Sequence, residues 1–246
     1  ADLKNGERIF NVGGCASCHA APATDKCEDH SSKDRLSLGG GKCLKTPFGT
    51  FYPPNISSDK ETGIGAWTDA QIAKAIREGI RPDGRLIGPP MPFELYRRIS
   101  DSDLMAIVAY LRTVTPVSNK VEKSVYRIPL PPAYGPPVTS VPDVPRTDKV
   151  KYGEYLAGPV GHCVECHTPM DDKGHRIWSR IGQGGDKFEG PWGVSVSRNL
   201  TPHPEDGLGK WSDAEIKRAI TQGISKDGAK LFPPMGFSFY AKVKDE

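Results

Sequence analysis

The 246-residue sequence lacks several features that would assign it to common protein classes. Hydrophobic residues make up only 37%, and the longest apolar run, Leu104 to Leu111, is far shorter than the roughly 20 residues that cross a bilayer. The net charge is only +3, and no block of lysine and arginine stands out. We therefore expect no transmembrane segment in this chain and no nucleic-acid partner.

Cysteine is also scarce, and four of the six cysteines form two Cys-x-x-Cys-His motifs. The motif residues are Cys15, Cys18 and His19 in the first copy, and Cys163, Cys166 and His167 in the second. In this pattern each thiol adds to one vinyl group of a porphyrin, and the histidine ligates the iron. A zinc site would need a further Cys or His pair, and a thiol redox pair needs no histidine. The motifs predict two covalently bound haem c groups.

The composition agrees with such a cofactor. The chain is long enough for two domains, yet its apolar content is low for two cores made of side chains alone. Buried porphyrins would supply the missing apolar surface. The 27 glycines and 23 prolines predict many turns and loops around them.

The two remaining cysteines, Cys27 and Cys43, lie outside both motifs in a polar, glycine-rich stretch. In an oxidising compartment such a pair favours a disulfide over two free thiols. A metal-binding role is the alternative, but no other residues with metal-ligand spacing accompany them. We predict a disulfide.

The two halves of the chain form an internal repeat. Three pairs of residues are each 144 positions apart: Asn55 and Asn199, Trp67 and Trp211, and Met91 and Met235. The two haem motifs are 148 apart. The four-residue difference falls in the loop between the haem motif and the asparagine, as expected for a duplicated domain with a loop insertion.

Each half contains a helix that begins directly after its tryptophan. Thr68 with Gln71, and Ser212 with Glu215, fit capping boxes, and Gly79 and Gly223 provide C-terminal stops. The indole N–H of Trp67 and of Trp211 is in position to donate a hydrogen bond to a haem propionate. The alternative is that the indole ring closes the helix start by a hydrophobic contact. Together with Asn55 and Asn199, these residues are our candidates for further cofactor contacts.

Methionine occurs only four times, and two copies lie at the same repeat position in proline-rich loops. Filling gaps in a core is the usual role of methionine. However, Met91 and Met235 follow Pro-Pro pairs that would fix their place, and His/Met ligation is typical of electron-transfer c haems. We predict that they are the sixth iron ligands. Met105, on a helix, and Met170 are less well placed.

We predict a mainly α fold of two tandem class I cytochrome c-like domains. The first spans 1–114 and ends in a helix, 104–114, capped by Ser100. A proline-rich linker, 115–148, joins it to the second domain, 149–246. Lys244–Glu246 occupy the position of the final helix in the second copy, so that helix is expected to be missing; an intact mass equal to 246 residues plus two haems would contradict a lost C-terminal piece.

Together these motifs resemble the multihaem cytochrome c subunits of bacterial membrane-associated alcohol and gluconate dehydrogenases. The resemblance covers nearly the whole chain outside the linker and the Cys27 to Cys43 stretch. It implies that electrons pass from a dehydrogenase to quinone or another acceptor. Those relatives usually carry three haem domains and a membrane-anchoring tail, whereas this chain has two haem motifs and no such tail. We therefore expect a soluble diheme carrier.

The primary functional hypothesis is electron transfer from a periplasmic dehydrogenase to a downstream cytochrome or oxidase, without catalysis by this chain. The alternative is a haem enzyme, a peroxidase or thiosulfate-oxidising type, with one exchangeable distal ligand. A docking subunit is a third hypothesis. Haem attachment of this kind occurs outside the cytoplasm, so we expect Ala1 to lie near the mature N-terminus of an exported protein. Arg77 and Arg81, which are Thr221 and Ser225 in the second copy, predict a higher potential for the first haem.

Overall fold

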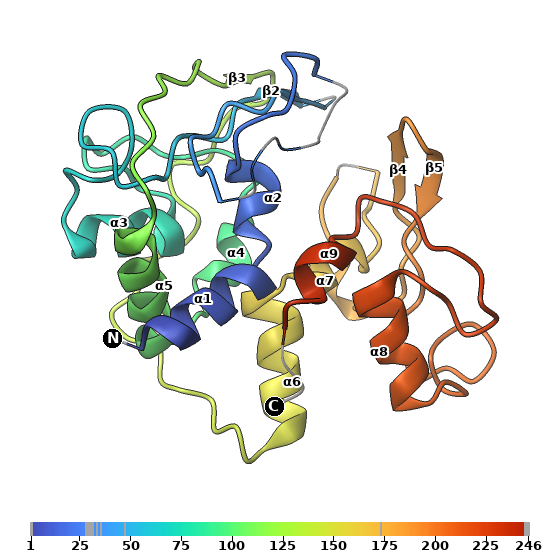
Figure 1. Cartoon of the computed structure of the whole chain (residues 1–246). Helices are drawn as coiled ribbons and strands as arrows, with labels where there is room; N and C mark the ends of the chain where they lie inside the picture. Colours follow the sequence, from blue (N-terminus) through green and yellow to red (C-terminus); the bar gives the residue numbers. More distant parts are fainter. Residues whose placement is uncertain are drawn as a thin grey trace. The chain divides into compact units, whose positions relative to one another are not determined.

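The computed structural model describes residues 2–243 apart from 28–31, 33, 35, 47 and 173. The chain forms two compact units, residues 1–155 and 156–246 (Figure 1). Both are largely helical with little sheet, as the sequence predicts. Lys244–Glu246, where the sequence predicts that a final helix is missing, lie outside the described residues. No helix in the described part of the chain combines the length and apolar character needed to cross a membrane.

The first unit contains six α-helices among its described residues. They are α1 (Leu3–Val12), α2 (Cys15–His19), α3 (Asp69–Glu78), α4 (Phe93–Tyr96), α5 (Asp101–Thr113) and α6 (Lys149–Tyr155). The sequence signals for these elements are confirmed in detail: Ser100 caps α5, Thr68 and Gln71 form the capping box of α3, and Gly79 ends α3 in the left-handed conformation.

Helices α1 and α5 pack against each other in the first unit (Figure 1). The buried face of α1 carries Ile9 and Phe10, and the ring of Phe10 lies 5.1 Å from that of Tyr110 on α5. The crossing is closest at Gly6, where an added Cβ would overlap the carbonyl oxygen of Ala106. Glycine at this position therefore allows the two backbones to approach.

Two small sheets were not predicted from the sequence. In the first unit, β1 (Leu44–Thr46), β2 (Gly49–Phe51) and β3 (Val125–Tyr126) form an antiparallel sheet in that order. In the second, β4 (Lys187–Gly190) pairs with β5 (Gly193–Val196). These strands are only two to four residues long, too short for an alternating pattern to be read.

Residues 115–148 make many contacts with the rest of the first unit. Strand β3 belongs to this segment, the carbonyl of Val117 accepts a hydrogen bond from Asn55 at 2.7 Å, and Val141 accepts one from the Asp101 N–H at 2.9 Å. The ring of Tyr134 stacks on Phe93 with centroids 4.6 Å apart. Composition favours an extended, hydrogen-bond-poor linker, but these side-chain and backbone contacts fix the segment to the first unit.

The second unit repeats much of this pattern. Its helices are η1 (Leu156–Val160), α7 (Cys163–Cys166), η2 (Trp178–Arg180), α8 (Asp213–Gln222) and α9 (Phe237–Tyr240). Helix α8 has the predicted capping box, Ser212 with Glu215, and the predicted left-handed Gly223 at its end. The repeated cap and stop signals thus give the same helix in both units.

One extra residue separates the helix from the haem motif in the second copy. Gly6 precedes Cys15 by nine positions, whereas Gly153 precedes Cys163 by ten. The structure accommodates this residue in η1, a π-helical turn in which the Gly161 N–H bonds to the Leu156 carbonyl at 2.7 Å. Single-residue insertions into helices are commonly absorbed in this way.

Candidate functional site: two Cys-x-x-Cys-His helices

The first motif forms the short helix α2, with His19 as its last residue. The side chain of His19 is buried, and its Nδ1 lies 2.9 Å from the carbonyl oxygen of Pro54. Because a carbonyl can only accept, Nδ1 must carry the proton of a neutral ring. Burial lowers the pKa of His19, which favours this neutral form. Nε2 is then left with a lone pair for a metal ion.

The second motif reproduces this arrangement. Helix α7 contains both cysteines, and His167 follows it directly. The Nδ1 of His167 lies 2.7 Å from the carbonyl oxygen of Arg198, and burial lowers the pKa of this histidine as well. Pro54 and Arg198 are 144 positions apart, the same offset as the other repeat pairs. Both imidazoles are therefore neutral, carry their proton on Nδ1 and are held in a fixed orientation, as iron ligands require.

None of the four motif cysteines is disulfide-bonded. Burial raises the pKa of Cys15 and of Cys166 to about 12, and that of Cys163 also rises. These cysteines are therefore thiols rather than thiolates at neutral pH.

A pair of glycines next to the motifs was missed in the sequence. The N–H of Gly40 bonds to the His19 carbonyl at 2.9 Å, and the N–H of Gly184 bonds to the His167 carbonyl at 2.7 Å. Both glycines have positive φ, +67° and +69°. Their spacing of 144 was the available signal. It also narrows the four-residue insertion to the stretch between His19 and Gly40.

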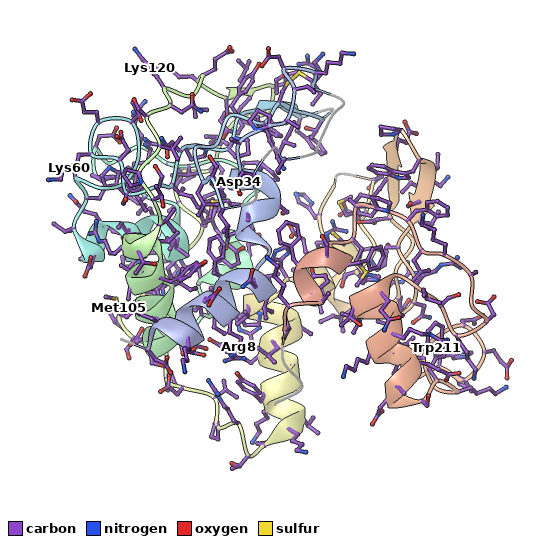
Figure 2. The ribbon with its side chains drawn as sticks, in the orientation of Figure 1. Arg8, Asp34, Lys60, Met105, Lys120 and Trp211 are labelled. Atoms are coloured by element: carbon purple, nitrogen blue, oxygen red, sulfur yellow. A yellow bond between two sulfur atoms is a disulfide. The ribbon has the colours of Figure 1, made fainter. Side chains whose placement is uncertain are left out.

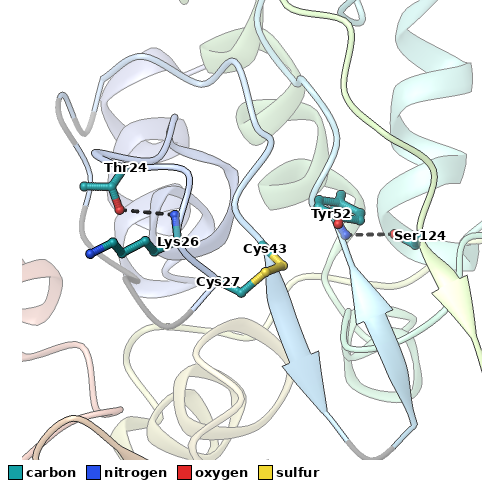
Figure 3. Close-up of a disulfide and its surroundings, with 6 residues drawn as sticks. All are labelled: Thr24, Lys26, Cys27, Cys43, Tyr52 and Ser124. Atoms are coloured by element: carbon teal, nitrogen blue, oxygen red, sulfur yellow. Dashed lines mark hydrogen bonds between the residues drawn. A yellow bond between two sulfur atoms is a disulfide. The ribbon is translucent and has the colours of Figure 1, made fainter.

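The predicted disulfide is confirmed: Cys27 and Cys43 are bonded (Figure 3). The residue before Cys43, Lys42, is only 2% exposed, and its ammonium donates to the carbonyl of Ser17 at 2.7 Å. Ser17 lies within helix α2. The disulfide stretch is therefore attached directly to the haem-motif helix.

The two candidate methionines occupy equivalent loops. The N–H of Phe93 bonds to the Met91 carbonyl at 2.9 Å, and the N–H of Phe237 bonds to the Met235 carbonyl at 3.1 Å. Met91 is partly buried and packs against a cluster of Tyr96, Ile99 and Leu104. Ligation of iron by these sulfurs stays a prediction. Met105 is 39% exposed on α5 (Figure 2), and Met170 is 41% exposed.

Trp67 contacts one of the two arginines that distinguish the first copy. The guanidinium of Arg81 lies 5.4 Å from the centroid of the Trp67 ring, and the carbonyl of Trp67 accepts a hydrogen bond of 2.5 Å from Arg112 on α5. Trp211 has the equivalent place before α8 (Figure 2), and its backbone N–H donates a hydrogen bond of 2.9 Å to the Leu208 carbonyl. Contacts of either indole with a cofactor stay predictions.

Asn55 serves the protein framework. Its amide nitrogen donates to the carbonyl of Val117 at 2.7 Å, and its side-chain oxygen accepts from the Ser57 N–H at 2.9 Å. In the second copy, Asn199 accepts from the N–H and the hydroxyl of Thr201, at 2.8 and 2.6 Å. These bonds fix the turns that follow Pro54 and Arg198. A direct contact of the asparagines with haem stays a prediction.

The residues present fit a covalently bound haem. Each unit supplies two thiols and a neutral imidazole with a free Nε2, which is the donor set that haem c uses. Several side-chain nitrogens are also buried without a hydrogen-bond partner, namely Nε of Arg77, Arg81 and Arg218, and Nε1 of Trp192. Buried polar groups usually have partners. The carboxylates of a porphyrin are groups of the kind that would satisfy them.

Helical units with this donor set define a protein that holds haem through thioether bonds. The sequence profile of the cytochrome c family matches residues 3–115. A "Diheme cytochrome c-type" protein of Cereibacter sphaeroides is 36% identical over 237 residues, covering 92% of this chain and 75% of the relative. The chain therefore belongs to the c-type cytochrome family, which implies covalently bound haem c.

Two dehydrogenase subunits are also similar to this chain. The cytochrome c subunit of alcohol dehydrogenase (quinone) from Gluconobacter oxydans is 32% identical over 90% of this chain and 47% of the relative. The gluconate 2-dehydrogenase cytochrome c subunit of Pantoea cypripedii is 32% identical over 90% of this chain and 51% of the relative. The chain spans about half the length of these two proteins. The resemblance predicted from the motifs is confirmed.

Proposed function

We propose that this chain is a diheme cytochrome that receives electrons from a dehydrogenase and passes them to a downstream acceptor. The observation that supports it most is the duplicated imidazole geometry: in both copies the motif histidine uses Nδ1 on a backbone carbonyl and keeps Nε2 for a metal. Two such sites favour two haems. The names of the relatives favour a dehydrogenase as the donor.

The proposed architecture is two tandem class I cytochrome c-like domains, 1–114 and 149–246, with the segment 115–148 between them. In this proposal α6, residues 149–155, is the first helix of the second domain, because it leads to the second motif. Within the first unit, the hydroxyl of Tyr155 donates to Asp103 at 2.7 Å. This contact fixes the end of α6 to α5 within the first unit.

In the proposed sites, Cys15 and Cys18 hold the first haem and Cys163 and Cys166 the second. His19 with Met91, and His167 with Met235, would ligate the two irons. When bound, the iron supplies a one-electron couple, and a methionine ligand raises its potential. The protein holds each imidazole in place through a carbonyl and needs no proton transfer, because both histidines are already neutral. With both axial positions filled, no substrate has to bind the metal.

We further propose that the protein works in the periplasm. The two Cys-x-x-Cys-His motifs and the disulfide favour export to an oxidising compartment. The donor is proposed to be a dehydrogenase and the acceptor a cytochrome or oxidase. Cell fractionation followed by haem staining would detect the protein in the periplasmic fraction, and its recovery in the cytoplasm would contradict this location.

The ligand assignment is tested by spectra of the holoprotein. Two haems per chain are expected from the pyridine haemochrome assay. The ferric protein should show the weak far-red band of methionine sulfur bound to haem, and Met91→Ala and Met235→Ala should each remove part of it. Met105→Ala changes an exposed methionine and is the control that keeps the band. One haem per chain, or no loss in either variant, would refute the assignment.

Carbon monoxide binding to the reduced holoprotein distinguishes electron transfer from the haem-enzyme alternative. A peroxidase or thiosulfate-oxidising enzyme needs one distal position that opens to substrate. Carbon monoxide added to the reduced protein should not bind rapidly at either haem if both methionines are bound. Rapid binding at one haem would favour catalysis at that site.

A further inference from the structure

The loop that carries Met91 is covered by a tyrosine from the segment 115–148. The hydroxyl of Tyr134 donates a hydrogen bond of 2.9 Å to the carbonyl of Ile87, four residues before Met91. The same ring stacks on Phe93, two residues after Met91, with an interplanar angle of 28°. Phe93 is only 1% exposed. Tyr134 therefore contacts the loop on both sides of the proposed ligand.

A second tyrosine of the segment lies on the same loop. A Cβ added to Gly88 would overlap the ring of Tyr126 and lie 2.7 Å from its hydroxyl oxygen. Glycine at this position thus lets the ring contact the loop backbone. The Tyr126 ring also lies against Phe51 of β2, with centroids 5.2 Å apart.

The segment itself is anchored before and after these rings. The hydroxyl of Ser124 accepts a hydrogen bond from the Tyr52 N–H at 2.9 Å (Figure 3), and Arg97 donates to the carbonyl of Pro136. Burial, and next the neighbouring Tyr126, raise the pKa of Tyr134 to about 12, so its hydroxyl remains a donor at neutral pH. Both rings are consequently held in place over the loop.

The Met235 loop provides an internal comparison. Its backbone turn is the same, since the N–H of Leu231 bonds to the Gly223 carbonyl at 2.7 Å, as Ile87 does to Gly79. The position of the buried Gly88 is taken there by Phe232, which is 53% exposed. The two loops therefore share a backbone turn and differ at the position where Tyr126 contacts the first of them.

We propose that Tyr134 and Tyr126 are positioning residues that clamp the Met91 loop, so that Met91 resists displacement from its iron by an external ligand. This inference rests on the proposed His/Met ligation. Because Met91 is carried on this loop, movement of the loop would take its sulfur away from the iron. For Met91 that movement breaks the Tyr134 hydrogen bond and separates two stacked rings. The clamp adds these costs at the first haem.

The test is an imidazole titration of the ferric holoprotein, followed by loss of the far-red methionine band. Met91→Ala and Met235→Ala assign the loss of the band to one haem each. In the Met235→Ala background only the Met91 band remains. There Tyr134→Phe should lower the half-displacement concentration about five-fold, as expected for loss of one net hydrogen bond. Tyr126→Phe keeps the ring and removes a hydroxyl with no hydrogen bond among the described residues, so it should change nothing.

The outcomes separate this inference from the proposed function. A Met91 band that is present but whose half-displacement concentration is unchanged by Tyr134→Phe would overturn the clamp alone. No band in the Met235→Ala protein would overturn the ligand assignment and the clamp together. If far-ultraviolet circular dichroism shows that Tyr134→Phe is unfolded, Gly88→Ala is the second test. A Cβ at this position would push the Tyr126 ring away from the loop, so the half-displacement concentration for Met91 should also fall.

Discussion

The contact between α1 and α5 makes a quantitative prediction for Gly6→Ala. A Cβ at this position would lie 2.7 Å from the carbonyl carbon of Ala106 and 3.0 Å from the Cβ of Tyr110, and it would overlap the Ala106 oxygen. These are backbone and stem atoms that cannot rotate away. Overpacking of this kind costs about 1–3 kcal/mol. Replacing a helical glycine by alanine stabilises the folded state by about 0.5–1 kcal/mol. Because the overlap at Gly6 is with backbone, an overpacking cost of about 3 kcal/mol applies, and the net loss of stability should be about 2 kcal/mol.

Gly153→Ala is the matched control. Gly153 lies on α6, in the same unit, and nothing lies within 4 Å of a Cβ added there. This variant should be neutral or more stable by about 0.5–1 kcal/mol. Thermal unfolding of the holoproteins, monitored by circular dichroism, should show Tm lower by about 4–8 °C for Gly6→Ala only. Equal Tm values for the two variants would refute the argument that the helices meet through Gly6.

Three further predictions concern the first unit. Replacing both Cys27 and Cys43 by serine opens a loop with a sequence separation of 16, which should lower the free energy of unfolding in guanidinium by about 3 kcal/mol, and reduced wild type should behave alike. Thr68→Ala removes the cap of α3 and should cost about 1 kcal/mol in the same assay, whereas Thr68→Ser should not. A hydrogen bond from Arg77 lowers the pKa of Asp101. The stability that this carboxylate contributes is therefore present above its unfolded pKa of about 3.9 and is lost as the pH falls through its folded pKa. Denaturation curves measured from about pH 5 to 2 should lack this acid-dependent component in Asp101→Asn.

The sequence was most informative where a feature depends on residue type and occurs twice. The caps Thr68 and Ser212 and the stops Gly79 and Gly223 predicted α3 and α8, because hydroxyl acceptors and left-handed glycines are local requirements. The disulfide was predicted from composition and compartment alone. In each case few residue types can meet the physical need.

Features that use the backbone of arbitrary residues could not be found in the same way. The carbonyls that orient His19 and His167 belong to Pro54 and Arg198, two residues with nothing in common except their spacing. Likewise, the prolines of residues 115–148 drew attention away from Tyr134, although an aromatic ring with a polar tip is well suited to bind a loop carbonyl. These contacts depend on the three-dimensional path of the chain.

The arginines that distinguish the first copy also acquire a different meaning from their contacts. Counting residues assigns two extra positive charges to the first haem. Arg77, however, is buried with its guanidinium 2.7 Å from the Asp101 carboxylate, so that pair contributes little net charge. Arg81 faces the neutral Trp67 ring, and the nearby Asp83 is paired mainly with Arg85, so Arg81 keeps most of its charge. Any electrostatic increase in the potential of the first haem should therefore come mainly from Arg81, and Arg81→Ser, which installs the residue of the second copy, should lower that potential in a redox titration while Arg77→Thr mainly lowers stability.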